Sequence, residues 1–172
     1  YFGNLPNSNI KRKDTTELLN WIKSTLPTNS EEKSNNVLFL SGSAGCGKTT
    51  ILRDLYELLA KDGIPVLGLK SDALIANNLD DLTTKINLTH PIIKSIIEVS
   101  KNVGKTIVLI DQLDALSQYL SSNRDYVNTY IQLIESLKNR HNIRVIVSIR
   151  EYDLNYDFSF HAYKNNIKIQ ET

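Results

Sequence analysis

The sequence is poor in the residues that define several large classes of protein. It contains no methionine and a single cysteine, Cys46, so a disulfide within the chain and a zinc site built from cysteines are both excluded. No apolar run approaches the roughly 20 residues that span a bilayer, and no stretch has the pattern of a signal peptide. These absences favour a reducing, cytoplasmic compartment and predict no membrane partner.

The chain also lacks an excess of charge of either sign. Lys and Arg total 20 and Asp and Glu total 19, which gives a formal net charge of +1. Because domains that bind nucleic acid carry a strongly basic patch, we expect no direct contact with nucleic acid. The small basic cluster Lys11-Arg12-Lys13 is typical of a solvated surface turn.

What is present suits one domain of a longer protein. The 172 residues, of which 41% are hydrophobic, suffice for a core of ordinary size. Tyr1 is too large to follow a removed initiator methionine, so we interpret the sequence as a piece of a longer chain. We divide it into a lead-in over residues 1–36, with a helix and a polar connector, and a core over residues 37–172.

Hydrophobic patterning predicts strands that alternate with helices. Residues 14–17, Asp-Thr-Thr-Glu, have the pattern of a capping box at the start of a helix that ends by Pro27. Residues 71–90 are ambiguous between short helices and loop. Such alternation predicts an α/β fold of three layers with a parallel five-stranded sheet. We expect its strands at 37–41, 65–69, 106–110, 143–149 and 167–169, and further helices from near 47, from 91, over 115–120 and over 125–140.

A phosphate-binding loop follows the first of these strands. Residues 42–49 match the pattern G-x-x-x-x-G-K-[ST] without departure. Glycines let the backbone direct its N–H groups at phosphate oxygens, while the lysine adds a point charge and the hydroxyl reaches Mg²⁺. We therefore assign nucleotide binding to Gly42, Ser43, Ala44, Gly45, Cys46, Gly47, Lys48, Thr49 and Thr50, and metal binding to Thr49.

An apolar strand that ends in acid predicts the metal and water site. Asp111 at the end of strand 106–110 would hold Mg²⁺ beside Thr49, and Asp114 would orient or deprotonate the attacking water. The alternative for Asp114 is that it caps a helix beginning at Ala115. The residue after Asp111 is Gln112, so the common Asp-Glu form of this motif is missing.

The strand over 143–149 also ends in polar residues. If it lies between the loop strand and the Asp111 strand, Ser148 and Arg150 are directed at the γ-phosphate, where Arg150 would sense the nucleotide. The alternative is a surface arginine paired with Glu151 or Asp153. Guanine-binding GTPases carry N-K-x-D, and the nearest string, residues 69–72, lacks the asparagine. That argues against guanine.

Three segments together resemble one known group of proteins: GSAGCGKTT, VLIDQLDAL and VIVSIREYDL, which begin at residues 42, 108 and 145. They resemble the signal-transduction NTPases called STAND, within the AAA+-like class, and above all the NACHT-type modules of large bacterial anti-phage sensors. The resemblance implies a sheet order of 5-1-4-3-2. It also implies Mg-ATP as ligand and a nucleotide-gated switch that self-associates on activation.

The same resemblance assigns roles to individual residues. It implies Lys48 and Thr49 as ligands of phosphate and Mg²⁺, Asp111 as the metal acid, and Asp114 and Arg150 as catalytic acid and sensor. Ala115 stands where these modules often have a glutamate, which argues for weak hydrolysis. Helical lid and winged-helix modules would follow beyond residue 172.

Other functions fit the same loop. A P-loop kinase of a small molecule would use an acceptor-binding acid, for which Asp72 is the candidate, but no arginine-rich lid is visible. An assembly scaffold would bind ATP with negligible turnover. A DNA-loading ATPase is disfavoured by the balanced charge.

Overall fold

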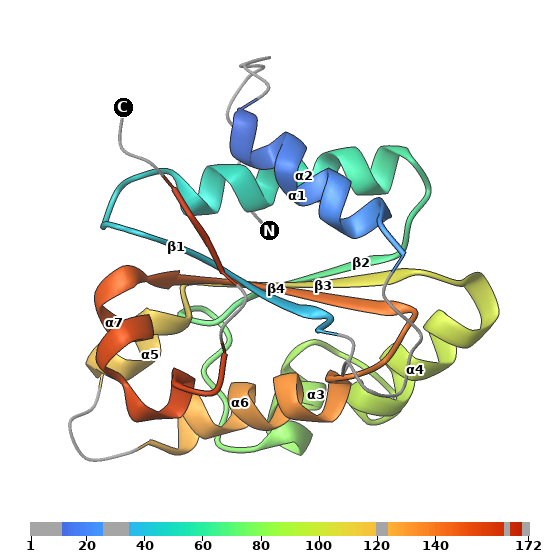
Figure 1. Ribbon diagram of the computed structural model, residues 1–172. Coiled ribbons are helices and arrows are strands. Elements are labelled where there is room, and N and C mark those ends of the chain that lie inside the picture. Colours follow the sequence, from blue (N-terminus) through green and yellow to red (C-terminus); the bar gives the residue numbers. More distant parts are fainter. Residues whose placement is uncertain (1–11, 26–34, 120–123, 164–165, 170–172) are drawn as a thin grey trace.

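The centre of the molecule is a five-stranded parallel sheet. The computed structural model describes residues 12–25, 35–119, 124–163 and 166–169 (Figure 1). Neighbouring strands follow the order β2-β3-β4-β1-β5, which is the predicted order 5-1-4-3-2 read from the other edge. All paired strands are parallel. The strands are β1 (Val37–Gly42), β2 (Val66–Lys70), β3 (Thr106–Asp111), β4 (Ile143–Arg150) and β5 (Asn166–Lys168).

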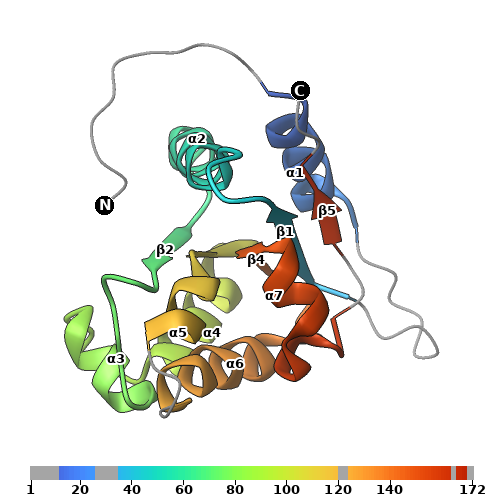
Figure 2. The same ribbon diagram turned by 90° about the vertical axis from the view of Figure 1, so that its left-hand side faces the viewer.

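Helices cover both faces of this sheet and complete three layers (Figures 1 and 2). Two of them, α1 (Lys13–Lys23) and α2 (Lys48–Lys61), lie on one face. The other face carries α3 (Leu79–Lys85), α4 (Ile92–Val103), α5 (Leu113–Tyr119), α6 (Asp125–Leu137) and α7 (Glu151–Tyr156). A short 3₁₀ turn, Phe158–Phe160, follows α7. The predicted α/β class is confirmed.

Two hydrophobic cores separate the layers because side chains alternate along each strand. Toward α1 and α2, strand residues such as Leu38, Leu40 and Ile146 pack with the buried face of α2. Toward the five other helices, residues such as Phe39 and Val147 pack with α6. Every residue of β1 and β3 is buried, as expected for central strands covered on both faces.

The element boundaries differ from the predicted ones in a few places. Helix α1 begins at Lys13, so Asp14 lies inside its first turn and the predicted capping box is wrong; Arg12 is the N-cap and forms no side-chain capping bond. The helix ends at Lys23, and Pro27 lies outside the described residues. The ambiguous stretch 71–90 contains α3, whose N-cap Asn78 accepts a hydrogen bond from the backbone N–H of Asp81 at 2.8 Å.

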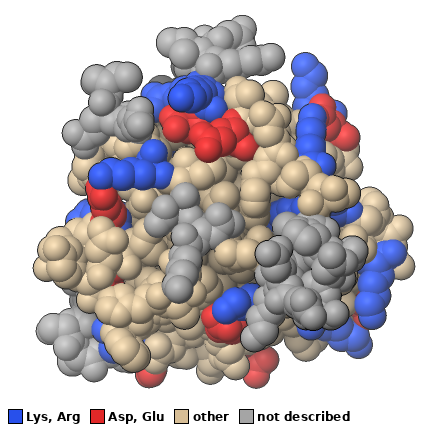
Figure 3. Space-filling view, in the orientation of Figure 1, with Lys and Arg blue, Asp and Glu red and all other residues tan. Residues whose placement is uncertain are grey.

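The surface shows both signs of charge. On the face drawn in Figure 3, basic and acidic side chains are interspersed with neutral surface. In the part of the chain that the structure describes, every helix is too short or too polar to cross a bilayer.

Candidate nucleotide site

The carboxyl ends of three central strands meet at one edge of the sheet. Strand β1 leads into the phosphate loop and α2, β3 ends at Asp111, and β4, which lies between them, ends at Arg150. A cavity of about 310 Å³ opens at this edge. It is lined by Ala44, Gly45, Gly47, Lys48, Thr49, Gln112, Asp114, Ala115 and Arg150. The structure therefore brings residues from all three predicted motifs to one cavity.

The phosphate loop has a backbone that requires glycine at two positions. Gly45 has a φ of 79° and Gly47 a φ of 94°, both in the left-handed region. Gly47 is also the N-cap of α2 and, having no side chain, forms no side-chain capping bond there. The first N–H groups of α2 and the positive end of its dipole therefore face the loop, which is the arrangement that attracts phosphate.

The lysine of the loop lies over the loop backbone. Lys48 is largely buried, with 9% of its surface exposed. Its Nζ donates to the carbonyl oxygens of Gly42 at 2.9 Å and Ser43 at 2.6 Å, and lies 3.7 Å from the sulfur of Cys46. The ammonium is thus held at the cavity by carbonyl groups, without a carboxylate in those contacts.

Asp111 is fully buried and only partly satisfied. Its Oδ1 accepts a hydrogen bond from the hydroxyl of Ser148 at 2.5 Å, whereas Oδ2 has no hydrogen-bond partner among the described residues. Burial raises the pKa of the Asp111 carboxyl, and the hydroxyls of Ser148 and Thr49 and the charge of Lys70 oppose that rise. A carboxyl group with an open oxygen next to a threonine hydroxyl fits a hard divalent cation, whose charge favours the ionised form.

Asp114 and Arg150 form an ion pair across the cavity. The Nε of Arg150 lies 2.9 Å from Oδ2 of Asp114, whose side chain is 7% exposed. Burial raises the pKa of the Asp114 carboxyl, and the guanidinium of Arg150 opposes this most strongly. Helix α5 begins at Leu113, so Asp114 is not its cap and that alternative is wrong. Of the two surface partners suggested for Arg150, Glu151 pairs instead with Lys168 at 2.6 Å.

Two serines hold the acidic turn in place, and sequence reasoning missed one of them. Gln112 adopts a φ of 59°, unusual for a residue other than glycine. Its backbone N–H donates to Ser148 Oγ at 2.8 Å, and Ser71 Oγ donates to the carbonyl oxygens of Asp111 at 2.9 Å and Gln112 at 2.7 Å. Ser148, predicted to face phosphate, is buried beneath Asp111 instead. A polar residue directly after β2 was the available signal for Ser71.

The candidate kinase acid lies beside this turn. Asp72 pairs with Lys70 at 3.6 Å, and its negative charge adds to the rise in the pKa of Asp111. Asp72 does not line the cavity described above.

Comparison with known proteins places the fold and the family. No curated protein matches the sequence. A solved structure of the ORC2 protein of Aeropyrum pernix, described as ADPNP–ADP complexes, superposes with a TM-score of 0.59 at 14% sequence identity. The likeness covers 98% of this chain and 50% of that one, so this chain spans half the length of that protein.

At that identity the superposition supports the fold alone, and family membership comes from the sequence profile. The profile called Novel STAND NTPase 3 matches residues 29–170, which include the phosphate loop, Asp111, Asp114 and Arg150. The chain, with its P-loop and the cavity at its sheet edge, belongs to the Novel STAND NTPase 3 family of nucleoside triphosphatases.

Proposed function

We propose that this domain binds Mg-ATP and hydrolyses it slowly, as the nucleotide-gated switch of a larger signalling protein. The observation that carries this proposal is the convergence of Lys48, Thr49, Asp111, Asp114 and Arg150 on one sheet edge, around a loop shaped to receive phosphate. Each of these residue types matches one requirement of phosphoryl transfer: charge on the phosphates, metal ligands, and a group that acts on water.

Adenine is the favoured base. The chain lacks the N-K-x-D string of guanine-specific GTPases, because Leu69 stands where the asparagine would precede Lys70. The Aeropyrum pernix protein with the similar fold is described with ADPNP, an ATP analogue, and ADP. Both observations support ATP as the ligand.

The buried acid fits Mg²⁺. Thr49 Oγ1 and the open Oδ2 of Asp111 would hold the ion, and positive charge there would relieve the raised pKa that burial gives Asp111. When bound, Mg²⁺ supplies charge that neutralises phosphate oxygens. The described residues contain no group of three or more His, Cys, Asp or Glu side chains that would hold a different metal.

Asp114 is the residue placed to act on water. Its carboxylate lines the cavity, and Arg150 fixes its orientation through a contact of 2.9 Å. The guanidinium of Arg150 opposes the rise in the pKa of the Asp114 carboxyl that burial causes, and so favours the ionised form that a base requires. A single acid in this position, followed by Ala115 rather than a glutamate, favours slow turnover.

Self-association is the part of the proposal that concerns the whole protein. Helix α7 follows Arg150 directly and, with the turn after it, exposes Tyr152, Tyr156 and Phe158 to 70%, 71% and 86%. A second cavity of about 380 Å³ lies between α7 and the loop and shares Ala44 and Arg150 with the first. These features support a contact that responds to nucleotide. A role in antiviral defence rests on the resemblance to NACHT-type sensors.

The decisive experiment removes the charge of the loop. Calorimetry should show that Lys48→Ala abolishes most Mg-ATP affinity, while Lys61→Ala, an exposed lysine at the far end of the same helix, does not. Unchanged Mg-ATP affinity in a folded Lys48→Ala protein would refute the assignment of the loop as the phosphate site. The domain alone should remain monomeric in light scattering and release phosphate well below about one per second.

The two alternatives have distinct signatures in the same assays. Phosphate transfer that requires an added acceptor would indicate a kinase. Stoichiometric retention of ATP without release would indicate a scaffold.

A further inference from the structure

Helix α1 lies outside the residues that match the family profile, yet its start lies against the phosphate loop. Arg12, the half-buried residue just before α1, has its guanidinium beside Gly47. A Cβ built on Gly47 would lie 2.4 Å from Nη1 of Arg12 and 3.3 Å from its Cζ. The guanidinium therefore covers one side of the loop backbone at the N-cap of α2. The sequence had instead suggested a solvated turn.

No anion within the described structure accounts for this position. Among the described side chains, no carboxylate forms an ion pair with Arg12. Its backbone carbonyl accepts hydrogen bonds from the N–H and hydroxyl of Thr16, which does not involve the charge. A half-buried cation thus lies beside the loop whose N–H groups are arranged to attract phosphate.

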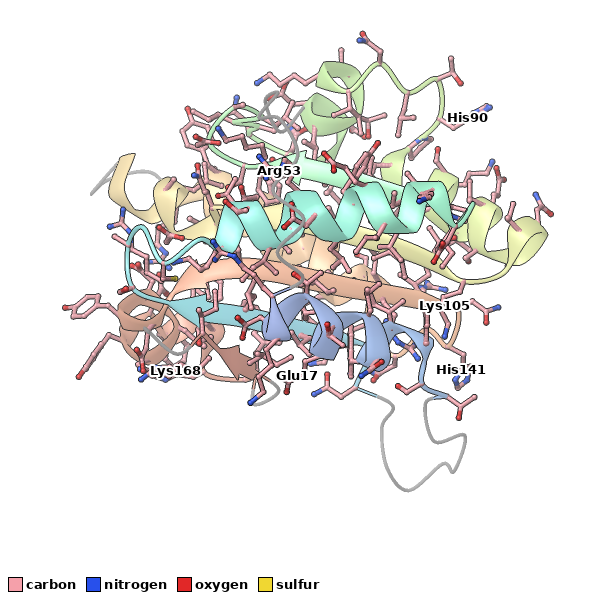
Figure 4. All side chains as sticks on the ribbon, turned by 90° about the horizontal axis from the view of Figure 1, so that it is seen from above. Glu17, Arg53, His90, Lys105, His141 and Lys168 are labelled. Atoms are coloured by element: carbon pink, nitrogen blue, oxygen red, sulfur yellow. The ribbon has the colours of Figure 1, made fainter. Side chains whose placement is uncertain are left out.

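The opposite end of α1 is anchored, which fixes where Arg12 lies. Lys105 Nζ donates to the carbonyl oxygens of Ile22 at 2.6 Å and Ser24 at 3.3 Å. Arg144 Nη2 donates to the same Ser24 oxygen at 2.8 Å and its guanidinium lies 5.4 Å from the Trp21 ring centroid. Figure 4 shows Lys105 near His141, at the end of the molecule opposite Lys168. Arg12 is therefore carried to the loop by a helix held at its far end.

The three cations near the loop do not all face the same cavity. Lys48 and Arg150 line the cavity that also contains Asp114, whereas Arg12 does not line that cavity. Arg12 instead covers Gly47 from a side outside it. Its charge thus lies beside the loop that would hold the nucleotide but outside the cavity that Asp114 lines.

We propose that Arg12 is a nucleotide-binding residue that contacts the phosphate chain from the side of Gly47 away from Asp114. The proposal rests on the proposed function, since it requires that the loop binds a nucleotide. Because the contact lies away from Asp114 and Arg150, it contributes to the affinity for diphosphate and triphosphate alike. Helix α1 becomes part of the nucleotide site, although the profile match does not include it.

Calorimetry with Mg-ATP and Mg-ADP tests this contact. Arg12→Ala should weaken the binding of both nucleotides by about tenfold or more, which is the effect of losing a hydrogen bond between charged groups. The ratio of the two affinities should stay unchanged. The matched control is Lys13→Ala, which removes the same charge from the adjacent, exposed position and should change affinity less than about twofold. Arg12→Lys should fall between them because it keeps charge without the planar fork.

A labelling experiment on the unaltered protein does not depend on how the variants fold. A dicarbonyl reagent specific for arginine should modify Arg12 more slowly in the presence of saturating Mg-ADP, while exposed Arg140, beyond the C-terminal end of α6, should react equally in both conditions.

Several outcomes would overturn the proposal. They are unchanged affinity in Arg12→Ala, weaker binding of ATP alone, tighter binding of both nucleotides, or equal labelling of Arg12 with and without nucleotide. Failure of the unaltered protein and the Lys13→Ala variant to bind nucleotide at all would instead refute the proposed function.

Discussion

Strand β4 carries an arginine near each end, and the two have different surroundings. Arg144, near the amino end, is 1% exposed and bonds to the backbone carbonyls of His141 and Ser24. Arg150, at the carboxyl end, has a 38% exposed side chain and pairs with the carboxylate of Asp114 across a cavity. The two arginines lie an even number of positions apart, so their side chains point to the same side of the sheet, which is also the side of Ile146.

The difference between them separates structure from function in this fold. The carbonyl oxygens of Ser24, at the end of α1, and of His141 hold Arg144 in a site where burial lowers the pKa of its guanidinium. Its Nε has no hydrogen-bond partner among the described residues. The Asp114 carboxylate offers Arg150 a site that water and ligand can reach. A residue that fixes α1 to the sheet is expected to affect folding, whereas one that faces a cavity is expected to affect turnover.

The largest expected effect is on stability, at the amino end. Arg144→Ala should lower the free energy of unfolding by about 3 kcal/mol, because it removes a fully buried side chain together with its hydrogen bonds to Ser24 and His141 and its contact with the Trp21 ring. Denaturant unfolding measures this, with exposed Arg140→Ala as the control. Mg-ATP affinity should persist in buffer where the variant is folded. An equal loss of stability in Arg150→Ala would remove the contrast between the two ends.

The next effect separates the two acids at the carboxyl end. Asp111→Asn should weaken Mg²⁺-dependent nucleotide binding by about tenfold or more, since it removes the open charged oxygen beside Thr49. Asp114→Asn should leave binding intact and slow phosphate release by a similar factor. Calorimetry and phosphate release measure the two quantities. If both variants bind and turn over as the unaltered protein does, neither acid serves the site.

Much of this arrangement could be predicted from the sequence. The convergence of Lys48, Asp111 and Arg150 follows from motif order, because the carboxyl ends of parallel strands meet at one edge. The Arg12 contact could not be predicted, since it depends on how α1 lies beside α2. The Ser71 contact was missed although the predicted order already placed the second strand beside the third. The capping-box prediction failed because Asp14, although its residue type is favoured at an N-cap, is the second residue of a helix that begins at Lys13.

The same two acids predict how stability depends on pH. Burial raises the pKa of Asp111 and Asp114 above the ordinary value of 3.8, so the folded state retains protons that the unfolded chain has already released. Stability is therefore greatest below about pH 4 with respect to these groups and is lost as pH rises through their raised pKa values. Without Mg²⁺, Asp111→Asn should be more stable than the unaltered protein at pH 7.

Thermal unfolding across pH 4 to 7 checks this sign. Asp111→Asn should reduce the loss of stability that accompanies rising pH. Saturating Mg-ATP should restore stability to the unaltered protein, but less to the variant. As a control, Asp125→Asn changes an exposed carboxyl in the first turn of α6. A decline of the same size in Asp111→Asn would mean that the buried acid does not cause it.

The smallest effect concerns the backbone of the acidic turn. Gln112 has a φ of 59° and Asn139 a φ of 61°, but asparagine adopts this left-handed region more readily than glutamine. Gln112→Gly should therefore stabilise the protein by up to about 1 kcal/mol, and Asn139→Gly by a few tenths at most. The hydrogen bonds that Ser71 and Ser148 form with Gln112 involve its backbone and not its side chain. Both bonds should therefore persist in the glycine variant. Phosphate release should then be unchanged if these serines hold the turn. A large loss of turnover in Gln112→Gly, with Asn139→Gly unaffected, would show that the Gln112 side chain itself acts in the site.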